Sequence, residues 1–274
     1  PLGRANDEIL TLIKQNQGQI DIMARMRDRS APPVLKDIFA IIGNGFYIVN
    51  RSMLQPIKNR LSYLKLPFEE AVMGVNNMPL VDFQWKVPFQ LRKDQIPVGE
   101  FLQNATNTFS LMVSSPPGSG KTVMAINHCI HRNKRTMFIM RPSYMEQWEE
   151  VLLYLKEEGF IVTNLVKDDI FMLASKKDID RLELELFKGT FDKKIIIASN
   201  KVYDRYIKSY VEYESSQLTD TRLAWPDKLN PLNFCELLGI GTVVADEVHS
   251  DLRFWHSFAS TLHVELFLGL SGTM

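Results

Sequence analysis

Short apolar runs alternate with amphipathic stretches along most of the chain, from Leu91 to Met274. Six runs rich in β-branched and aromatic residues have the length of buried strands, at 109–115, 136–140, 160–166, 194–199, 241–246 and 265–272. Between them, apolar residues recur at helical spacing over 121–132, 143–159, 176–189, 201–215 and 248–262. The interval 217–233 breaks this alternation, and we expect it to form a surface loop. Strand–helix alternation of this kind predicts an α/β fold with a parallel sheet flanked by helices.

The region before Leu91 follows a different pattern. Apolar positions recur at helical spacing over 6–29, after a candidate N-cap at Asn6. Further helical stretches lie at 34–42 and 53–66, with a short strand between them at 45–50. We therefore expect a small, mainly helical N-terminal module over residues 1–66. The irregular, proline-containing sequence of 67–90 predicts a connector to an α/β domain over 91–274.

Composition limits the partners that the chain can have. Its 274 residues, 45% of them hydrophobic, suffice for one large α/β domain and a smaller element. Lys and Arg number 32, as do Asp and Glu, so a nucleic-acid site would have to be a local patch or use backbone amides and hydroxyls. No apolar run is long enough to span a bilayer, so we expect no membrane partner. Two distant cysteines without metal-ligand spacing predict reduced thiols and a cytoplasmic or nuclear location.

The stretch Ser114–Thr122, SSPPGSGKT, follows an apolar run and opens a helical stretch. That context favours a phosphate-binding loop, because glycines let backbone amides turn toward phosphate oxygens and the helix N-terminus adds a favourable dipole. Lys121 would reach the β and γ phosphates of a nucleotide, and the Thr122 hydroxyl would coordinate Mg²⁺. The pattern departs at Ser115, where a glycine is usual, and at Pro117, which we expect to stiffen the loop. The alternative is a glycine-rich turn that binds nothing.

An acidic pair follows a later apolar run, where Asp246 and Glu247 open the sequence DEVH. Open α/β sheets place ligands at the carboxyl ends of their parallel strands. Hydrolysis of a phosphoanhydride needs one carboxylate at the metal and a second that orients or deprotonates water. We therefore predict Asp246 as the metal-side carboxylate and Glu247 as the general base. The alternative is that the two acids merely cap the helix that follows.

Three segments in chain order resemble motifs I, II and III of superfamily-two helicases and translocases: SSPPGSGKT, DEVH and GLSGT. Motif Ia of the branch that includes XPB-like, viral and restriction-enzyme-type translocases is similar to FIMRPSYMEQWEEVL, and motif Ib is similar to IIIASNKVY. The upstream LRKDQ resembles the adenine-reading Q motif. The resemblance covers 91–274. It implies a RecA-like fold and an ATP-dependent nucleic-acid motor, a nucleoside triphosphatase that needs ATP and Mg²⁺.

The resemblance implies a role for each matched residue at the nucleotide. Gln95 is expected to read the adenine edge, with Arg92 nearby, although Pro97 limits the helix usual there and leaves the register of that contact open. His249 is expected to link the nucleotide site to motif III; from the residues alone, an ordinary polar helix residue stays open. The residues implied to hold the phosphates and Mg²⁺ or to act in catalysis and coupling are Pro117, Gly118, Ser119, Gly120, Lys121, Thr122, Asp246, Glu247, Ser271 and Thr273.

The resemblance also implies nucleic acid as the partner, with DNA favoured over RNA. Arg141, Pro142, Ser199 and Asn200 stand at positions that usually face its backbone. A grip through strand-end amides, hydroxyls and helix N-termini fits the neutral net charge. From the residues alone, Arg141 is equally well a solvated surface charge. Trp148 is predicted to pack in the core rather than to stack on a base.

In the family, a second RecA-like domain follows motif III and supplies an arginine finger. This sequence ends at GLSGTM, so we expect a first motor domain whose ATP hydrolysis alone is weak. The alternative from a different class is a catalytically silent RecA-like scaffold or docking module in a larger nucleic-acid complex, against which the intact Lys121, Asp246 and Glu247 argue. For the first helix, packing on the α/β domain is favoured over pairing with a protein partner. A viral replication or transcription site is a further location.

Overall fold

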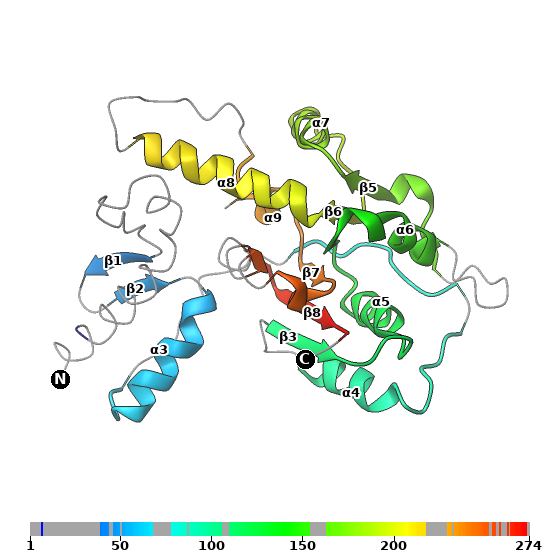
Figure 1. Cartoon of the computed structure of the whole chain (residues 1–274), viewed down its shortest axis with the longest axis horizontal. Helices are drawn as coiled ribbons and strands as arrows, with labels where there is room; N and C mark the ends of the chain where they lie inside the picture. Colours follow the sequence, from blue (N-terminus) through cyan, green and yellow to red (C-terminus); the bar gives the residue numbers. More distant parts are fainter. Residues whose placement is uncertain are drawn as a thin grey trace. The chain divides into compact units, whose positions relative to one another are not determined.

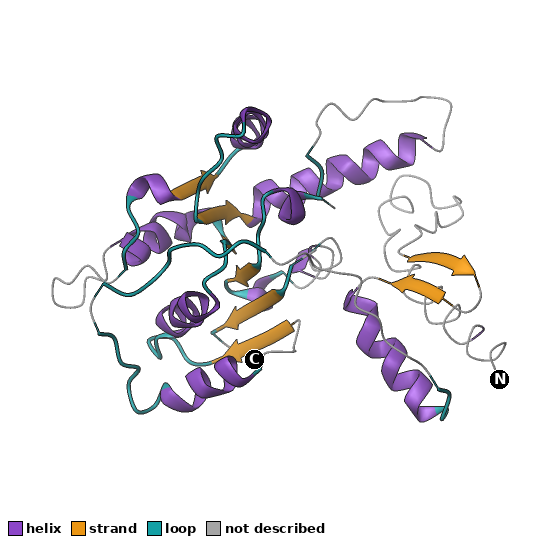
Figure 2. Ribbon diagram, turned by 180° about the vertical axis from the view of Figure 1, so that it is seen from behind, coloured by secondary structure: helices purple, strands orange, loops and turns teal. Residues whose placement is uncertain are grey.

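Figure 1 shows the chain as a computed structural model, and Figure 2 shows it from behind. Close backbone contacts divide the chain into two compact units, Pro1–Met73 and Gly74–Met274. The predicted helix over 6–29, apart from residue 7, and most of the interval 217–233 lie outside the described residues. The residues that the structure describes are 7, 39–43, 46–49, 51–67, 78–86, 88–105, 110–153, 163–217, 229–231, 233–251, 254, 255, 258, 262 and 264–272.

The smaller unit contains an antiparallel pair of strands, β1 (Phe39–Gly43) and β2 (Phe46–Val49), and the helix α3 (Arg51–Tyr63). The strand predicted at 45–50 and the helix predicted at 53–66 are confirmed. The helix predicted at 34–42 is wrong from Phe39 onward. Its apolar residues FAII stand before Gly-Asn-Gly, a turn signal, and pair with the aromatic and β-branched FYIV, so cross-strand pairing outweighs the helical spacing.

The larger unit is built on a six-stranded sheet in which every neighbouring pair is parallel, in the order β3-β8-β7-β4-β6-β5. The strands are β3 (Ser110–Ser114), β4 (Thr136–Met140), β5 (Ile170–Leu173), β6 (Ile195–Ser199), β7 (Thr242–Ala245) and β8 (Leu266–Ser271). Every strand but β5 lies within a run that the sequence predicted. The predicted parallel sheet flanked by helices is therefore confirmed.

Helices cover both faces of this sheet (Figures 1 and 2). One face carries α4 (Ile96–Asn104), α5 (Lys121–Arg132) and α6 (Met145–Leu153), and the other carries α7 (Lys176–Lys188), α8 (Asn200–Gln217) and α9 (Phe234–Leu237). Successive strand residues point to opposite faces, so Phe138 of β4 joins the first core and Ile139 the second. The short 3₁₀ helices are η1 (Pro142–Tyr144), η2 (Lys167–Asp169) and η3 (Val248–Ser250). No helix in these described ranges is long and apolar enough to cross a membrane.

One strand lies elsewhere than predicted. The apolar run at 160–166 predicted the third strand of the sheet, but β5 follows later, at IFML. Of the described residues in the run, Thr163 forms an isolated β-bridge with Trp85, and Asn164 hydrogen-bonds Gln84. Both runs are short and apolar, so their pattern cannot decide which of them pairs with β6. In the predicted helix at 248–262, the described residues are η3, the helical positions 254, 255 and 258, and the non-helical positions 251 and 262.

Residues 78–86, which the sequence predicted to be part of a connector, pack onto the larger unit. Phe83 is 2% exposed and joins the core beneath α4, α5 and α6. Its backbone N–H donates to Oδ1 of Asn133 at 3.1 Å, and Nε1 of Trp85 donates to Oδ1 of Asn127 at 2.9 Å. This segment lacks a regular apolar period, which is why the sequence did not reveal its place in the core.

Candidate active site

The predicted site residues follow strands that all end at the same edge of the sheet. Because the six strands are parallel, Ser114 of β3 stands beside Ser271 of β8, and Met140 of β4 stands beside Ser199 of β6. Ala245, the last residue of β7, lies between these pairs. We call this the carboxyl edge. It brings together segments that are far apart in the sequence, at the place where open α/β sheets bind ligands.

The phosphate loop, residues 115–120, joins β3 to α5. The N–H of Ser119 donates to the carbonyl of Pro116 at 3.2 Å, which closes a turn. Gly118 has a φ of 78°, as the third residue of a type II turn requires, and proline suits the position before it. Pro117 therefore fits the turn that the loop makes, and its departure from the usual motif has a structural reason.

Lys121 opens α5, after Gly120 in the left-handed region with a φ of 83°. Its Nζ donates to the carbonyl of Ser115 at 2.7 Å and to that of Pro116 at 3.2 Å, so the ammonium lies within the curve of the loop. Oγ of Ser119 is buried and has no hydrogen-bond partner in the described part of the chain. A cation, an unsatisfied hydroxyl and a helix N-terminus together fit the phosphates of a nucleotide.

Arg92 and Gln95 hold the phosphate loop from outside. Gln95 is 5% exposed, and its Nε2 donates to the carbonyl of Ser119 at 2.9 Å. Nη2 of Arg92 donates to the same carbonyl at 3.0 Å, and the backbone N–H of Arg92 donates to Oε1 of Gln95 at 3.1 Å. These contacts fix the loop from the segment that the sequence predicted to read adenine; the adenine contact itself stays a prediction.

Asp246 follows β7, and both of its carboxylate oxygens accept hydrogen bonds. The backbone N–H of Glu247 donates to Oδ1 at 3.0 Å, and Nε1 of Trp148 donates to Oδ2 at 2.9 Å. Burial raises the pKa of Asp246, and the neighbouring Glu247 carboxylate raises it further, against the opposing effects of the two hydrogen bonds and of Lys121. A nearby cation would stabilise the ionised form of a buried carboxylate whose pKa is raised in this way.

Glu247 has a φ of 54°, an uncommon conformation for a residue other than glycine. Nδ1 of His249 lies 3.1 Å from Oε2 of Glu247 and 3.0 Å from Oγ of Ser271. A Cβ placed on Gly272 would lie 3.4 Å from Oε1 of Glu247 and 3.8 Å from Nζ of Lys121. The predicted base, the lysine of the phosphate loop and the end of β8 therefore meet in one place.

The residues predicted to face nucleic acid lie farther along the carboxyl edge. Arg141 and Pro142, after β4, are exposed. Ser199 and Asn200, at the end of β6, are 1% and 7% exposed. Oγ of Ser199 accepts a hydrogen bond from the N–H of Val202 at 3.4 Å and so serves the first turn of α8, while Oδ1 of Asn200 has no partner among the described residues. Of these four residues, only Arg141 and Pro142 have side chains exposed to a large ligand.

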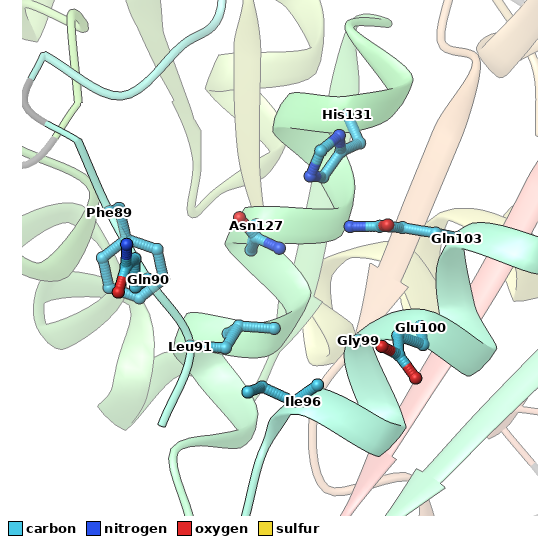
Figure 3. Close-up of a pocket in the computed structure, with 9 residues that line it drawn as sticks. All are labelled: Phe89, Gln90, Leu91, Ile96, Gly99, Glu100, Gln103, Asn127 and His131. Carbon is cyan, nitrogen blue, oxygen red and sulfur yellow. The ribbon is translucent and has the colours of Figure 1, made fainter. Parts of the chain in front are cut away.

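A half-open pocket of about 330 Å³ lies between α4 and α5 (Figure 3). Gln103 of α4 and Asn127 and His131 of α5 line it, and the residues of its lining include none from the phosphate loop.

The helix α4 begins at Ile96 with Pro97 in its first turn, where the missing N–H costs no hydrogen bond. Pro97 therefore stands at the beginning of the helix, after Gln95, and does not interrupt it.

Two predicted residues remain to be placed, the metal ligand Thr122 and the coupling residue Thr273. Thr122 is the second residue of α5 and half-buried, and Thr273 lies outside the described residues. In the described ranges, no three or more His, Cys, Asp or Glu side chains gather as a metal-binding group. The Thr122 hydroxyl and the Asp246 carboxylate offer the oxygen ligands that Mg²⁺ prefers, and Mg²⁺ takes few ligands from a protein.

Trp148 contacts the candidate site in a way that sequence reasoning missed. Its predicted packing role is confirmed, because it is 3% exposed and its ring lies 4.9 Å from that of Phe138. The hydrogen bond from its indole to Asp246 was not predicted. The two residues are 98 positions apart, and no local pattern in the sequence links them.

No family model matches the chain, and no curated protein matches it. Among solved structures, the helicase domain of Hef from Pyrococcus furiosus is similar to it with a TM-score of 0.41 and 17% identity, over 68% of this chain and 35% of that one. The SWI2/SNF2 ATPase core of Sulfolobus solfataricus, in complex with dsDNA, is similar with a TM-score of 0.42 and 16% identity, over 73% of this chain and 34% of that one. The chain thus spans about a third of the length of these two chains.

Proposed function

We propose that the chain carries the ATP-binding domain of a nucleic-acid motor, a DNA helicase or translocase of superfamily two. The observation that carries this proposal is that Nζ of Lys121 and the carboxylate of Glu247 both lie beside Gly272 at the carboxyl edge. A cation for phosphate and a base for water are the two groups that hydrolysis of a phosphoanhydride requires from the protein.

In this proposal, the triphosphate of ATP binds to residues 117–122, in the phosphate loop and the first turn of α5, with Arg92 and Gln95 beside the adenine. Lys121 neutralises charge on the β and γ phosphates. Glu247 accepts a proton from water as the water oxygen bonds to the γ phosphorus and the bond to the β-phosphate oxygen breaks, giving ADP and inorganic phosphate. His249, with Ser271 and Thr273, links this site to the rest of the carboxyl edge.

Thr122 and Asp246 are the proposed ligands of Mg²⁺. When bound, the ion would neutralise charge on the phosphates of the nucleotide. Asp246 supports this assignment, because burial raises its pKa and a cation beside it would favour the ionised carboxylate. A second domain with an arginine finger would raise the rate of hydrolysis further.

Calorimetric titration of the chain with ATP decides between this proposal and the silent scaffold. The motor proposal expects one site per chain and an affinity that rises when Mg²⁺ is present, because Asp246 and Thr122 act through the ion. Absence of heat from ATP at every Mg²⁺ concentration, with a folded protein, would favour the scaffold.

The nucleic-acid part of the proposal needs its own test. Arg141, exposed at the carboxyl edge, is the proposed contact to a phosphate of the backbone. Arg141→Ala should weaken the binding of a fluorescent DNA duplex uniformly across sequences and reduce its salt dependence, as measured by anisotropy. Lys188→Ala, at an exposed lysine on α7, is the matched control and should change neither. Equal binding by all three proteins would contradict the assignment of Arg141.

A further inference from the structure

The Asp246 carboxylate is held by two donors, of which one comes from a distant part of the chain. The backbone N–H of Glu247 bonds to Oδ1, and the indole of Trp148 bonds to Oδ2 at 2.9 Å. The first bond is local to the turn after β7. The second reaches across from α6, so it fixes the rotation of the carboxylate relative to the sheet and not only relative to its own turn.

The indole is in turn held rigidly. Trp148 is 3% exposed, belongs to the core beneath α4, α5 and α6, and its ring lies 4.9 Å from that of Phe138 on β4. The backbone of β4 also holds Asp246 directly, because the Asp246 N–H donates to the carbonyl of Ile139 at 2.9 Å. The side chain and the backbone of Asp246 are therefore both fixed to one rigid part of the fold.

We propose that Trp148 is a positioning residue of the nucleotide site, which holds the Asp246 carboxylate in the orientation that a nucleotide-bound Mg²⁺ meets. The inference rests on the proposed function, because it requires a nucleotide at the carboxyl edge. A ligand whose orientation is already fixed loses less conformational freedom when the metal binds, and outer hydrogen bonds of this kind commonly tune metal affinity.

A purely structural role makes a different prediction. A buried indole N–H needs an acceptor, and Asp246 is one. If the bond served only the core, its loss would lower stability and leave the Mg²⁺ dependence of nucleotide binding unchanged. The two roles therefore separate when nucleotide affinity is measured with and without Mg²⁺.

The test is Trp148→Phe, which keeps an aromatic ring beside Phe138 and removes the donor. ATP affinity is measured by calorimetry in excess Mg²⁺ and in EDTA. We expect about a tenfold loss with Mg²⁺, as for removal of a hydrogen bond to a charged group, and less than about a twofold change in EDTA. Trp85→Phe is the matched control: it removes the indole bond to Asn127, away from Asp246, and should leave both affinities unchanged.

Two further proteins make the result decisive. Replacement of Trp148 by benzothienylalanine keeps the bicyclic ring and lacks the N–H, so it gives the answer even if the phenylalanine variant does not fold. In an Asp246→Asn background, Trp148→Phe should cause no further loss of Mg²⁺-dependent affinity. Equal losses with and without Mg²⁺, or no loss, would overturn the positioning role while the parent still binds ATP. A folded parent that binds no ATP would overturn the proposed function and the positioning role together.

Discussion

His128 shows how a single buried residue ties stability to pH. It lies on α5, is 4% exposed, and neither of its ring nitrogens has a hydrogen-bond partner in the described part of the chain. Burial, together with the nearby charges of Arg132 and His131, lowers its pKa from 6.5 to about 4. The folded protein therefore keeps this imidazole neutral at pH values where the unfolded chain protonates it.

We expect the free energy of unfolding to fall as the pH drops from 6.5 toward 4, since only the unfolded state binds the proton at His128. The pKa shift corresponds to a loss of about 3 kcal/mol, complete near the lower pKa. Urea unfolding at several pH values measures it. His128→Leu should flatten this dependence, whereas His131→Leu, at an exposed histidine on the same helix, should leave most of it in place, because burial is the main cause of the shift. The same pH slope in the parent and in His128→Leu would show that another group is responsible.

At the scale of elements, the phosphate loop depends on contacts with the segment before α4. Gly120 stands in the left-handed region, and a Cβ there would lie 2.2 Å from Nε2 of Gln95. The same Nε2 donates to the carbonyl of Ser119, so the absence of a side chain at Gly120 lets Gln95 reach the loop. Backbone conformation and close approach both require glycine at this position.

Gly120→Ala is therefore expected to destabilise the larger unit by about 2–3 kcal/mol and to weaken ATP binding, because the methyl group displaces Gln95 and changes the loop. Thermal unfolding and calorimetry measure the two effects. Gly189→Ala is the matched control: its φ is 66° and a Cβ there meets nothing within 4 Å, so it carries only the conformational cost of about 1 kcal/mol. Equal costs for the two substitutions would rule out the contact with Gln95.

Most elements of the sheet unit could be predicted from the sequence, because their apolar runs are bounded and correctly spaced. α5 begins and ends where the pattern of its residues predicted, at Lys121 and Arg132. β5 could not be predicted, because the apolar runs at 160–166 and 170–173 are both short and either could pair with β6. The error at β1 has a similar origin: FAII suits a helix or a strand, and its pairing with β2 decides between them.

The same limit holds for the candidate site. Motif residues such as Lys121 and Glu247 could be identified because each carries its own local pattern. The contacts that orient them join distant segments: Trp148 to Asp246, and Gln95 to the carbonyl of Ser119. Such hydrogen bonds depend on which helix covers which strand, and a sequence read locally does not contain that information.

At the scale of the whole molecule, residues 78–86 matter most for where the larger unit begins. Met78 and Phe83 are 5% and 2% exposed, and Oε1 of Glu265 accepts a hydrogen bond from the N–H of Met78 at 3.3 Å. Glu265 also pairs with Arg132 at 2.9 Å. The segment is therefore part of the core and of an ion-pair network, and the larger unit cannot start at Leu91 without losing both.

A chain that begins at Gly74 should fold cooperatively, because it keeps the contacts of Met78 and Phe83 within the larger unit. A chain that begins at Leu91 should lose about 3–5 kcal/mol or more of unfolding free energy, as for truncation of a large buried aromatic side chain. Circular dichroism during thermal or urea unfolding compares the two. Equal stability would mean that the segment adds nothing to the core.

For the molecule as a whole, we propose that the carboxyl edge binds ATP through Lys121. The most direct measurement is the thermal unfolding midpoint of the parent and of Lys121→Ala, each with and without ATP and Mg²⁺. At a ligand concentration about a hundredfold above Kd, binding stabilises the folded state by about 2.7 kcal/mol, which corresponds to a rise of roughly 5–10 °C for a unit of this size. We predict that rise in the parent and almost none in Lys121→Ala. No rise in the parent, or the same rise in both proteins, would contradict the claim.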